Sequence, residues 1–326
     1  MAGSEVLVSV LCTAYNHEDY IAQTLDSFLM QETDFPFEIL VSDDASTDRT
    51  ADIIREYAAR CPGIIRPILM EENQFSRGVN LYTDVLLPAA RGKYAALCEG
   101  DDYWTDPRKL QLQADFMQTH PAYSAVAHNT TLHYCETGQQ DRPLIREAGD
   151  RDLDLKRLLS GASYCFHTSS LFARLDLMRD PPEFYRVAQR SGFLDYALNL
   201  WLGINGRVRY LDRVMSVYRI NSGSGAWSSG VDFQYQKLRR YIRGEIDMLR
   251  AFLPLVSGGD EALVRHEILE REFELMYIEG RDREQRRPPY HEILRAKPFS
   301  YRFKNALKCA FPHAAAAYRR RRGYRD

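Results

Sequence analysis

The sequence lacks the features that would place it in a membrane, in an oxidising compartment or on nucleic acid. Its six cysteines are scattered over 326 residues without a C-x-x-C pair, which argues against a zinc site or a disulfide framework. No apolar run approaches the ~20 residues that a membrane-spanning helix needs. The formal net charge of −2 creates no field that would attract nucleic acid. The start, MAGSEVLVSVLC, is too short and too weakly charged for a signal peptide, so we expect a cytoplasmic globular protein.

Apolar segments alternate with amphipathic ones over the first hundred residues. Strands are predicted at residues 6–11, 37–41, 64–70 and 94–98, with helices between them. Strands this apolar are buried on both faces, which indicates an α/β fold with a mostly parallel central sheet flanked by helices. The pattern is looser over residues 125–230, and long charged helices are predicted in residues 231–326. We therefore expect one α/β domain (1–230) and a C-terminal helical appendage (231–326).

Two pairs of carboxylates follow predicted strands. Asp43 and Asp44 come after the second strand, and Asp101 and Asp102 come after the fourth. Because the carboxyl ends of parallel strands share one rim of a sheet, both pairs should lie where open α/β sheets bind ligands. Adjacent carboxylates repel each other unless a cation holds them, and oxygen ligands of this kind suit Mg²⁺ or Mn²⁺.

The alternative is that these carboxylates only serve the helices that follow them. Other residues are better placed for that purpose. Asp106 is predicted to cap the helix that begins at Pro107, and Ser46 or Thr47 to cap the helix after the second strand. The two carboxylate pairs therefore remain available for a site.

Three motifs taken together resemble glycosyltransferase family 2. They are VSVLCTAYNHEDYIAQTLDSFLMQ, EILVSDDASTDRT and EGDDYWTDPRKL, in the family's order and at its spacing. The resemblance covers residues 6–225 and implies the Rossmann-like GT-A fold and transfer of a sugar from a nucleotide-sugar donor. The nucleotide would then bind in residues 1–102 and the acceptor in residues 103–230. Residues 231–326 resemble no family that we can name.

The resemblance also implies which residues hold the nucleotide. Tyr15 would stack its flat face on the base, although packing on the first helix is an alternative for it. Asp43 would hydrogen-bond the base, most often a uracil, and Asp44 would support the loop through backbone N–H groups. Asn73 belongs to the same polar loop as Arg77 and could touch the donor as well. The implied nucleotide-binding residues are Thr13, Tyr15, Asn16, Asp43, Asp44, Arg77 and Asp101.

The acidic motif implies a site for Mn²⁺ or Mg²⁺. Asp101 and Asp102 match the family's D-x-D-type element, in which one carboxylate contacts the ribose or the metal and the other binds the metal. Glu99 replaces the first acidic residue of many members and is longer by one methylene. The metal would bridge the diphosphate of the donor and offset the charge of the leaving nucleotide. Asn221 stands where a histidine is common, and an amide is a poorer metal ligand.

Family members are typically inverting, with one carboxylate that deprotonates the acceptor hydroxyl. The matching residue is Asp195 in SGFLDYALNLWL, for which the alternative is a carboxylate favoured only by the helix dipole. His167 either binds the acceptor or satisfies a core hydrogen bond. The remaining implied donor or acceptor contacts are Glu99, Trp104, Tyr218, Arg219 and Ser224, the last three from the segment VYRINSGSGAW, which resembles a loop that closes over the diphosphate.

The expected activity is metal-dependent transfer of a single sugar, most often from a UDP-sugar, to a glycan or lipid-linked acceptor in surface polysaccharide synthesis. The Q-x-x-R-W motif and the membrane spans of processive members are missing. Two alternatives stay open: a catalytically inactive nucleotide-sugar-binding scaffold, and a metal-dependent nucleotidyltransferase, which would want a Gly-rich basic loop after the first strand. The basic run Arg319–Arg322 is either solvated or contacts anionic lipid at the inner face of the membrane, and the charged tail could form a homodimer.

Overall fold

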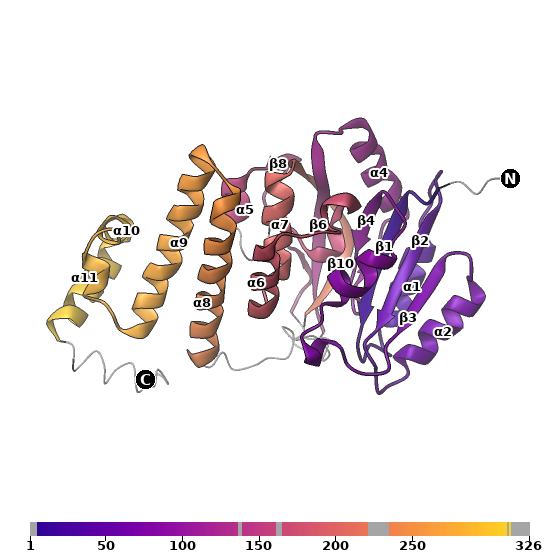
Figure 1. Ribbon diagram of the computed structural model, residues 1–326, viewed down its shortest axis with the longest axis horizontal. Coiled ribbons are helices and arrows are strands. Elements are labelled where there is room, and N and C mark those ends of the chain that lie inside the picture. Colours follow the sequence, from indigo (N-terminus) through magenta and orange to yellow (C-terminus); the bar gives the residue numbers. More distant parts are fainter. Residues whose placement is uncertain (1–4, 136–138, 161–164, 221–234, 312, 314–326) are drawn as a thin grey trace. The chain divides into compact units, whose positions relative to one another are not determined.

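The computed structural model describes residues 5–135, 139–160, 165–220, 235–311 and 313 (Figure 1). The chain divides into two compact units. The first consists of Met1–Pro181 and Leu198–Gly230, and the second of Pro182–Ala197 and Val231–Asp326.

A mixed sheet forms the centre of the first unit. Among the described residues its strands follow the order β3-β2-β1-β4-β9-β6-β10-β5, with β7 beside β6 and β8 beside β10. The strands are β1 (Val8–Ala14), β2 (Phe37–Asp43), β3 (Ile65–Leu69), β4 (Tyr94–Leu97), β5 (Tyr103–Trp104), β6 (Tyr123–Tyr134), β7 (Arg142–Pro143), β8 (Arg151–Leu153), β9 (Phe172–Arg174) and β10 (Arg207–Ile220). Strands β3, β2, β1 and β4 are parallel, which confirms the α/β prediction. Beyond them, β9 is antiparallel to β4 and β6, whereas β10 runs parallel to β6.

The helices of the first unit pack apolar faces against this sheet. They are α1 (Ile21–Leu29), α2 (Thr50–Arg60), α3 (Leu87–Ala89), α4 (Lys109–Thr119), α5 (Leu155–Ser160) and the later part of α7 (Leu194–Ile204). Short 3-10 or π-helical turns lie at Phe75–Arg77, Leu81–Leu86, Thr168–Ser170 and Leu175–Leu177. In α1, Ile21, Leu25 and Phe28 recur at helical spacing and are fully buried in the core that lines β1, β2 and β4.

The predicted cap of α4 is wrong. The helix begins at Lys109, two residues after Pro107, and no side chain caps its first turn. Asp106 instead stabilises the turn before the helix, because its Oδ1 accepts a hydrogen bond from Arg108 N at 2.9 Å. Its Oδ2 lies 2.6 Å from a guanidinium nitrogen of Arg213. Asp106 therefore pairs with Arg213, which lies far away in the sequence, instead of capping the helix.

A buried carboxylate links the amino ends of the strands, at the rim of the sheet opposite the acidic pairs. Glu38, near the start of β2, is 1% exposed. Its Oε1 accepts hydrogen bonds from Ser9 Oγ at 2.8 Å and from Arg91 N at 2.7 Å, and its Oε2 accepts from Arg66 at 2.6 Å. Burial alone would raise the pKa of Glu38, but these hydrogen bonds outweigh it and lower the pKa. The amino ends of the strands are thus held by one ionised group.

The second unit is helical in its described residues. Its helices are α6 (Glu183–Ser191), the first turn of α7, α8 (Tyr235–Phe252), α9 (Gly258–Glu279), α10 (His291–Ala296) and α11 (Phe299–Ala310), with 3-10 turns at Leu253–Leu255 and Glu284–Arg286. Helices α8 and α9 confirm the prediction of long charged helices. A Cβ on Gly244 would lie 2.6 Å from the Cβ of Ser191, so α6 and α8 cross where α8 lacks a side chain. In the part of the chain that the structure describes, no helix has the length and apolar content needed to cross a bilayer.

Candidate active site

Three side chains that could ligate a metal ion meet where β4 ends. Glu99 and Asp102 follow β4, and His167 precedes the 3-10 turn that leads into β9. Each offers one ligand atom, and these atoms lie within 4.8 Å of one another. Carboxylate oxygens with an imidazole nitrogen form a donor set that suits Mn²⁺ and related divalent ions.

The protonation equilibria at this position fit a cation. Burial, and then the charges of Asp101 and Glu99, raise the pKa of Asp102 well above its usual value, while the backbone N–H and charge of Arg219 oppose the shift. Burial lowers the pKa of His167 to about 4, so its imidazole is neutral at pH 7 and can act as a ligand. A divalent ion would relieve the repulsion between the carboxylates, and the residues present therefore fit the metal that the acidic motif implies.

Asp101 faces a different neighbour from Asp102. Its Oδ2 lies 4.0 Å from His17 Nε2, and Asp101 does not belong to the group of three potential ligands. The sequence paired Asp101 with Asp102 as metal ligands, whereas the structure gathers Asp102 with Glu99 and His167. Asp101 is thus not one of the three grouped ligands.

A buried arginine near the end of β10 clamps the acidic segment. The backbone N–H of Arg219 donates to Asp102 Oδ1 at 3.0 Å. Its guanidinium group donates to the carbonyl oxygen of Asp101 and to Gln23 Oε1. The guanidinium carbon also lies 4.5 Å from the ring centroid of Tyr103 and 4.9 Å from that of Tyr20. Arg219 is only 6% exposed, so it positions the acidic segment from within the fold.

Helix α1 supplies a second clamp, which sequence reasoning missed. Thr24 Oγ1 lies 2.9 Å from the carbonyl oxygen of Gly100 and 2.6 Å from that of Asp102. A Cβ on Gly100 would lie 2.8 Å from His17 Nδ1, so the acidic turn approaches His17 at a distance that only glycine allows. The available signal was a polar residue, Thr24, on the otherwise apolar face of a predicted helix.

His167 is held by two neighbours. Its Nδ1 lies 2.9 Å from Ser169 Oγ, which orients the ring, and its ring stacks on Tyr218 with centroids 4.1 Å apart. The structure therefore brings His167 and Tyr218, which lie 51 residues apart in the sequence, to the same site as Asp102.

The loops after β1 and β2 are tied together by hydrogen bonds. Asn16, with a φ of 54°, donates its backbone N–H to Ser46 Oγ, and its Oδ1 accepts from Thr47 N, both at 2.9 Å. Asp43 Oδ2 accepts from Ser46 N at 3.0 Å, and its Oδ1 is bonded by the Ser46 hydroxyl. The prediction that Ser46 or Thr47 caps α2 is wrong, since that helix begins at Thr50 without a side-chain cap.

Asp44 supports the next loop, as the family resemblance implied. Its carboxylate accepts hydrogen bonds from Gln74 N at 2.6 Å and Phe75 N at 3.1 Å, and Asn73 Nδ2 donates to its carbonyl oxygen. In the same loop, Arg77 is bonded to the carboxylate of Glu72 at the surface.

Tyr15 and Trp104, two predicted contact residues, differ in their exposure to solvent. Strand β1 ends with Thr13 and Ala14, and Tyr15 follows them directly. Tyr15 is 39% exposed and can reach a ligand. Trp104 is 1% exposed, and its Nε1 donates to the carbonyl oxygen of Ser169 at 2.9 Å. The ring of Trp104 lies in the core, where it supports the acidic segment and Ser169.

The remaining predicted residues lie elsewhere. Asp195, in the first turn of α7, belongs to the second unit, where its charge adds to the burial that raises the pKa of Tyr185. Asn221, Ser224 and the basic run Arg319–Arg322 lie outside the residues that the structure describes.

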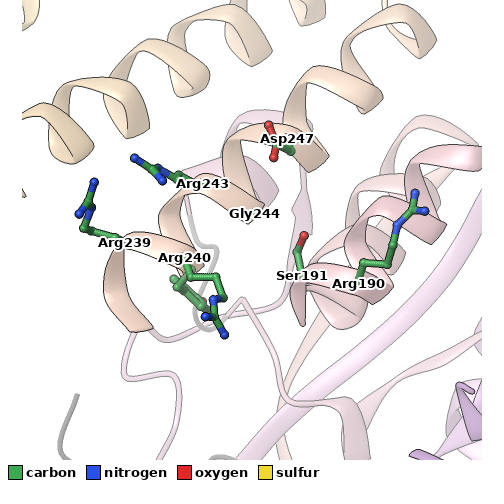
Figure 2. A pocket seen from close by; sticks show the side chains of 8 residues that line it. Arg190, Ser191, Arg239, Arg240, Arg243, Gly244 and Asp247 are labelled. Atoms are coloured by element: carbon green, nitrogen blue, oxygen red, sulfur yellow. The ribbon is translucent and has the colours of Figure 1, made fainter. Parts of the chain in front are cut away.

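The second unit contains an arginine-lined cavity of about 540 Å³ between α6 and α8 (Figure 2). Its lining residues are Arg190, Ser191, Arg239, Arg240, Tyr241, Arg243, Gly244 and Asp247. Figure 2 shows Arg239 and Arg243 extending to the same side of α8, where both pair with Glu279. No residue predicted from the sequence lines this cavity, which is positively charged.

Comparisons with known proteins identify the family. Residues 9–179 match Glycosyl transferase family 2. An uncharacterized protein of Mycobacterium tuberculosis is 37% identical over 78% of this chain and 70% of its own length. The glucosyltransferase WfaP of Escherichia coli, described as UDP-Glc:alpha-D-GlcNAc-diphosphoundecaprenol beta-1,3-glucosyltransferase, is 35% identical over 37% of this chain and 45% of its own. The structure of S. aureus TarS 1-349 in complex with UDP-GlcNAc superimposes with a TM-score of 0.59 at 19% identity, covering 91% of this chain and 83% of that TarS fragment. The chain thus belongs to glycosyltransferase family 2, and is a glycosyltransferase with the GT-A fold.

Proposed function

We propose that this glycosyltransferase moves a single sugar from a nucleotide-sugar donor, a UDP-sugar, to a glycan or lipid-linked glycan acceptor in surface polysaccharide synthesis. The observation that supports this most directly is the group formed by Glu99, Asp102 and His167 at the carboxyl end of β4. WfaP is described as using UDP-Glc, and TarS 1-349 was solved with UDP-GlcNAc, which favours UDP among the nucleotides.

Glu99, Asp102 and His167 would hold the metal, Mn²⁺ or Mg²⁺. When bound, such an ion supplies positive charge that stabilises the nucleoside diphosphate as it leaves. Arg219 and Thr24 keep the backbone that carries Asp102 in place, which preserves the ligand geometry without reorganisation during the reaction. Tyr15 is exposed enough to stack on the base, and the loop that Asp44 supports would border the nucleotide.

Transfer also needs a base for the acceptor hydroxyl, and we assign this role to Asp195. In an inverting displacement, Asp195 would take the proton from the acceptor oxygen as that oxygen attacks the sugar carbon. Asp195 is the residue that the family resemblance matches to this role, and it lies in the first turn of α7.

Calorimetric titration with UDP, GDP, TDP and CDP, each with and without Mn²⁺, tests the donor site. We expect UDP to bind, and to bind only weakly without the metal. Asp102→Ala should abolish the effect of Mn²⁺, whereas Asp115→Asn, an exposed carboxylate on α4, should leave it unchanged. Wild-type affinity of Asp102→Ala for UDP with Mn²⁺ would remove Asp102 from the metal site.

Release of UDP from a UDP-sugar in the presence of a lipid-linked glycan acceptor tests catalysis. We expect Asp195→Asn to bind UDP normally but to lose transfer, and Glu183→Gln, an exposed carboxylate on α6, to retain both. Transfer by Asp195→Asn at a rate close to wild type would place the base elsewhere. Donor binding without transfer by the wild type would favour a scaffold.

A further inference from the structure

Helix α11 presents a stripe of large apolar side chains to solvent. Phe299, Phe303 and Leu307 are 73%, 54% and 44% exposed, and Phe311, just after the helix, is 63% exposed. Because an α-helix has 3.6 residues per turn, side chains four positions apart lie within about 40° of each other around the axis. The rings of Phe299 and Phe303 are nearly parallel, with centroids 6.1 Å apart. These residues form one continuous stripe, which we call the α11 stripe.

The opposite side of α11 is firmly packed, so the stripe does not result from a loosely placed helix. Asn305 is 2% exposed, and its Nδ2 donates to Gln285 Oε1 at 2.7 Å. Tyr301 packs against Phe273 and Tyr277, with ring centroids 6.1 and 5.7 Å apart. These contacts fix the rotation of the helix and hold the α11 stripe outward.

Positive charge borders the α11 stripe on both sides. By helical geometry, Arg302 lies about 60° from Phe299 on one side, and Lys304 lies about 60° beyond Leu307 on the other. Both are exposed. The sequence has no acidic residue between Glu292 and Asp326, so no carboxylate neutralises this face from its own segment. The arginine-lined cavity adds further positive charge to the second unit (Figure 2).

An apolar stripe between two rows of cations matches the surface of an anionic bilayer. Phenylalanine and leucine side chains can enter the boundary between headgroups and acyl chains, while arginine and lysine stay at the level of the lipid phosphates. A second copy of the chain fits less well, because it would bring the same cations together. One face of a three-turn helix also buries much less than the ~800 Å² per partner of a stable protein interface.

We propose that α11 docks this protein onto an anionic lipid bilayer, with the α11 stripe inserted and with Arg302 and Lys304 at the phosphates. Helix α11 is the yellow helix of Figure 1. This inference does not depend on the donor site, and it assigns membrane contact to a packed helix. It thereby differs from an interaction made only by the charge of the run Arg319–Arg322.

Sedimentation of the full chain with lipid vesicles tests the proposal. We expect binding to vesicles of phosphatidylglycerol and phosphatidylcholine, weaker binding to phosphatidylcholine alone, and loss of binding as salt is raised. The double substitution Phe299→Ser/Phe303→Ser should reduce binding about tenfold or more. Phe75→Ser, which removes an equally exposed phenylalanine from the first unit, should bind as the wild type does.

The single variant Phe303→Trp tests insertion without weakening the fold. Its tryptophan fluorescence should shift to the blue on anionic vesicles and should be quenched by lipids brominated in their acyl chains, whereas Phe75→Trp should show neither effect. Absence of the shift in Phe303→Trp would overturn the proposal. The proposal would also be overturned if the double variant bound vesicles as the wild type does while replacement of Arg319–Arg322 by glutamine abolished binding. In that case the charge of the tail would suffice for membrane contact. A concentration-dependent dimer that the double variant abolishes would also overturn it, in favour of a contact between copies.

Discussion

A lysine in the core beneath the acidic segment should make the stability of this enzyme depend on pH. Lys109, the first residue of α4, is fully buried. Its Nζ donates to Gln113 Oε1 at 2.8 Å and lies 4.0 Å from the ring centroid of Trp104. Burial lowers the pKa of Lys109 to about 7, and no carboxylate counters this shift.

The direction of the pH dependence follows from the two states of the chain. In the unfolded chain the pKa of this lysine is near 10.5, and in the folded protein it is about 7. Between these values unfolding takes up a proton, so the free energy of unfolding rises with pH by up to about 1.4 kcal/mol per pH unit. Below pH 7 the ammonium group is charged in both states, and its burial costs about 5 kcal/mol relative to high pH.

Lys109→Met should therefore stabilise the protein in acid. Methionine has a similar length and needs no hydrogen bond, but it leaves Gln113 Oε1 without its donor, which costs about 1–3 kcal/mol. The net gain at pH 6 should be about 3 kcal/mol, and it should shrink as pH rises from 7 to 10, where the wild-type lysine becomes neutral.

Urea unfolding at a series of pH values from 6 to 9 measures this difference directly. The free energies of the wild type and of Lys109→Met should converge as pH rises. Lys93→Met, which replaces an exposed lysine, should run parallel to the wild type. A constant difference between Lys109→Met and the wild type over this range would show that the lysine does not titrate there, and would refute the reasoning.

Two further substitutions probe the two rims of the sheet. Glu38→Gln should destabilise the first unit by about 3 kcal/mol in urea unfolding at pH 7, because it leaves two arginines beside an uncharged group, and the loss should shrink in acid, where the wild-type carboxylate is itself protonated. An unchanged unfolding free energy at pH 7 would contradict this account. Gly100→Ala should weaken Mn²⁺-dependent binding of UDP by pushing His17 and the acidic turn apart, measured by calorimetry beside Gly63→Ala, whose Cβ would meet no neighbour.

The first four strands and the acidic rim could be predicted because they depend on local patterns. Strands such as β1 and β2 are apolar throughout, and their carboxyl ends must meet if they are parallel. The loop support by Asp44 came from the family resemblance rather than from a local pattern, and the structure shows the backbone N–H groups that its carboxylate accepts.

The composition of the metal-binding group could not be predicted in full. His167 reaches Asp102 because β9 pairs antiparallel with both β4 and β6, and this pairing leaves no periodic signal in so short a strand. Trp104 was expected near a ligand from its place in the motif, yet it turns inward to Phe28 and Lys109. Neighbouring residues in a motif can thus face opposite sides of the backbone.

The helix caps failed for a related reason. Asp106 and Ser46 are residues that usually cap helices, and the prediction considered only the helix that follows each of them. In the structure, Asp106 pairs with Arg213 of β10, and the Ser46 hydroxyl bonds Asp43 three positions earlier in the same loop. Capping preferences alone do not show which other partners a folded chain offers to the same side chain.

The hydrogen bond from Arg219 to Asp102 spans 117 positions of the chain, and this has a consequence for synthesis on the ribosome. The strands that precede Tyr15, Asp44 and Asp102 leave the ribosome long before Arg219 is made. Until β10 pairs with β6, the acidic turn is held only by Thr24 of its two clamps, and Asp102 has no backbone donor from β10. A nascent chain should therefore acquire its nucleotide-side loops first and its metal site last, so that a truncated product carries the donor motifs without a formed metal site.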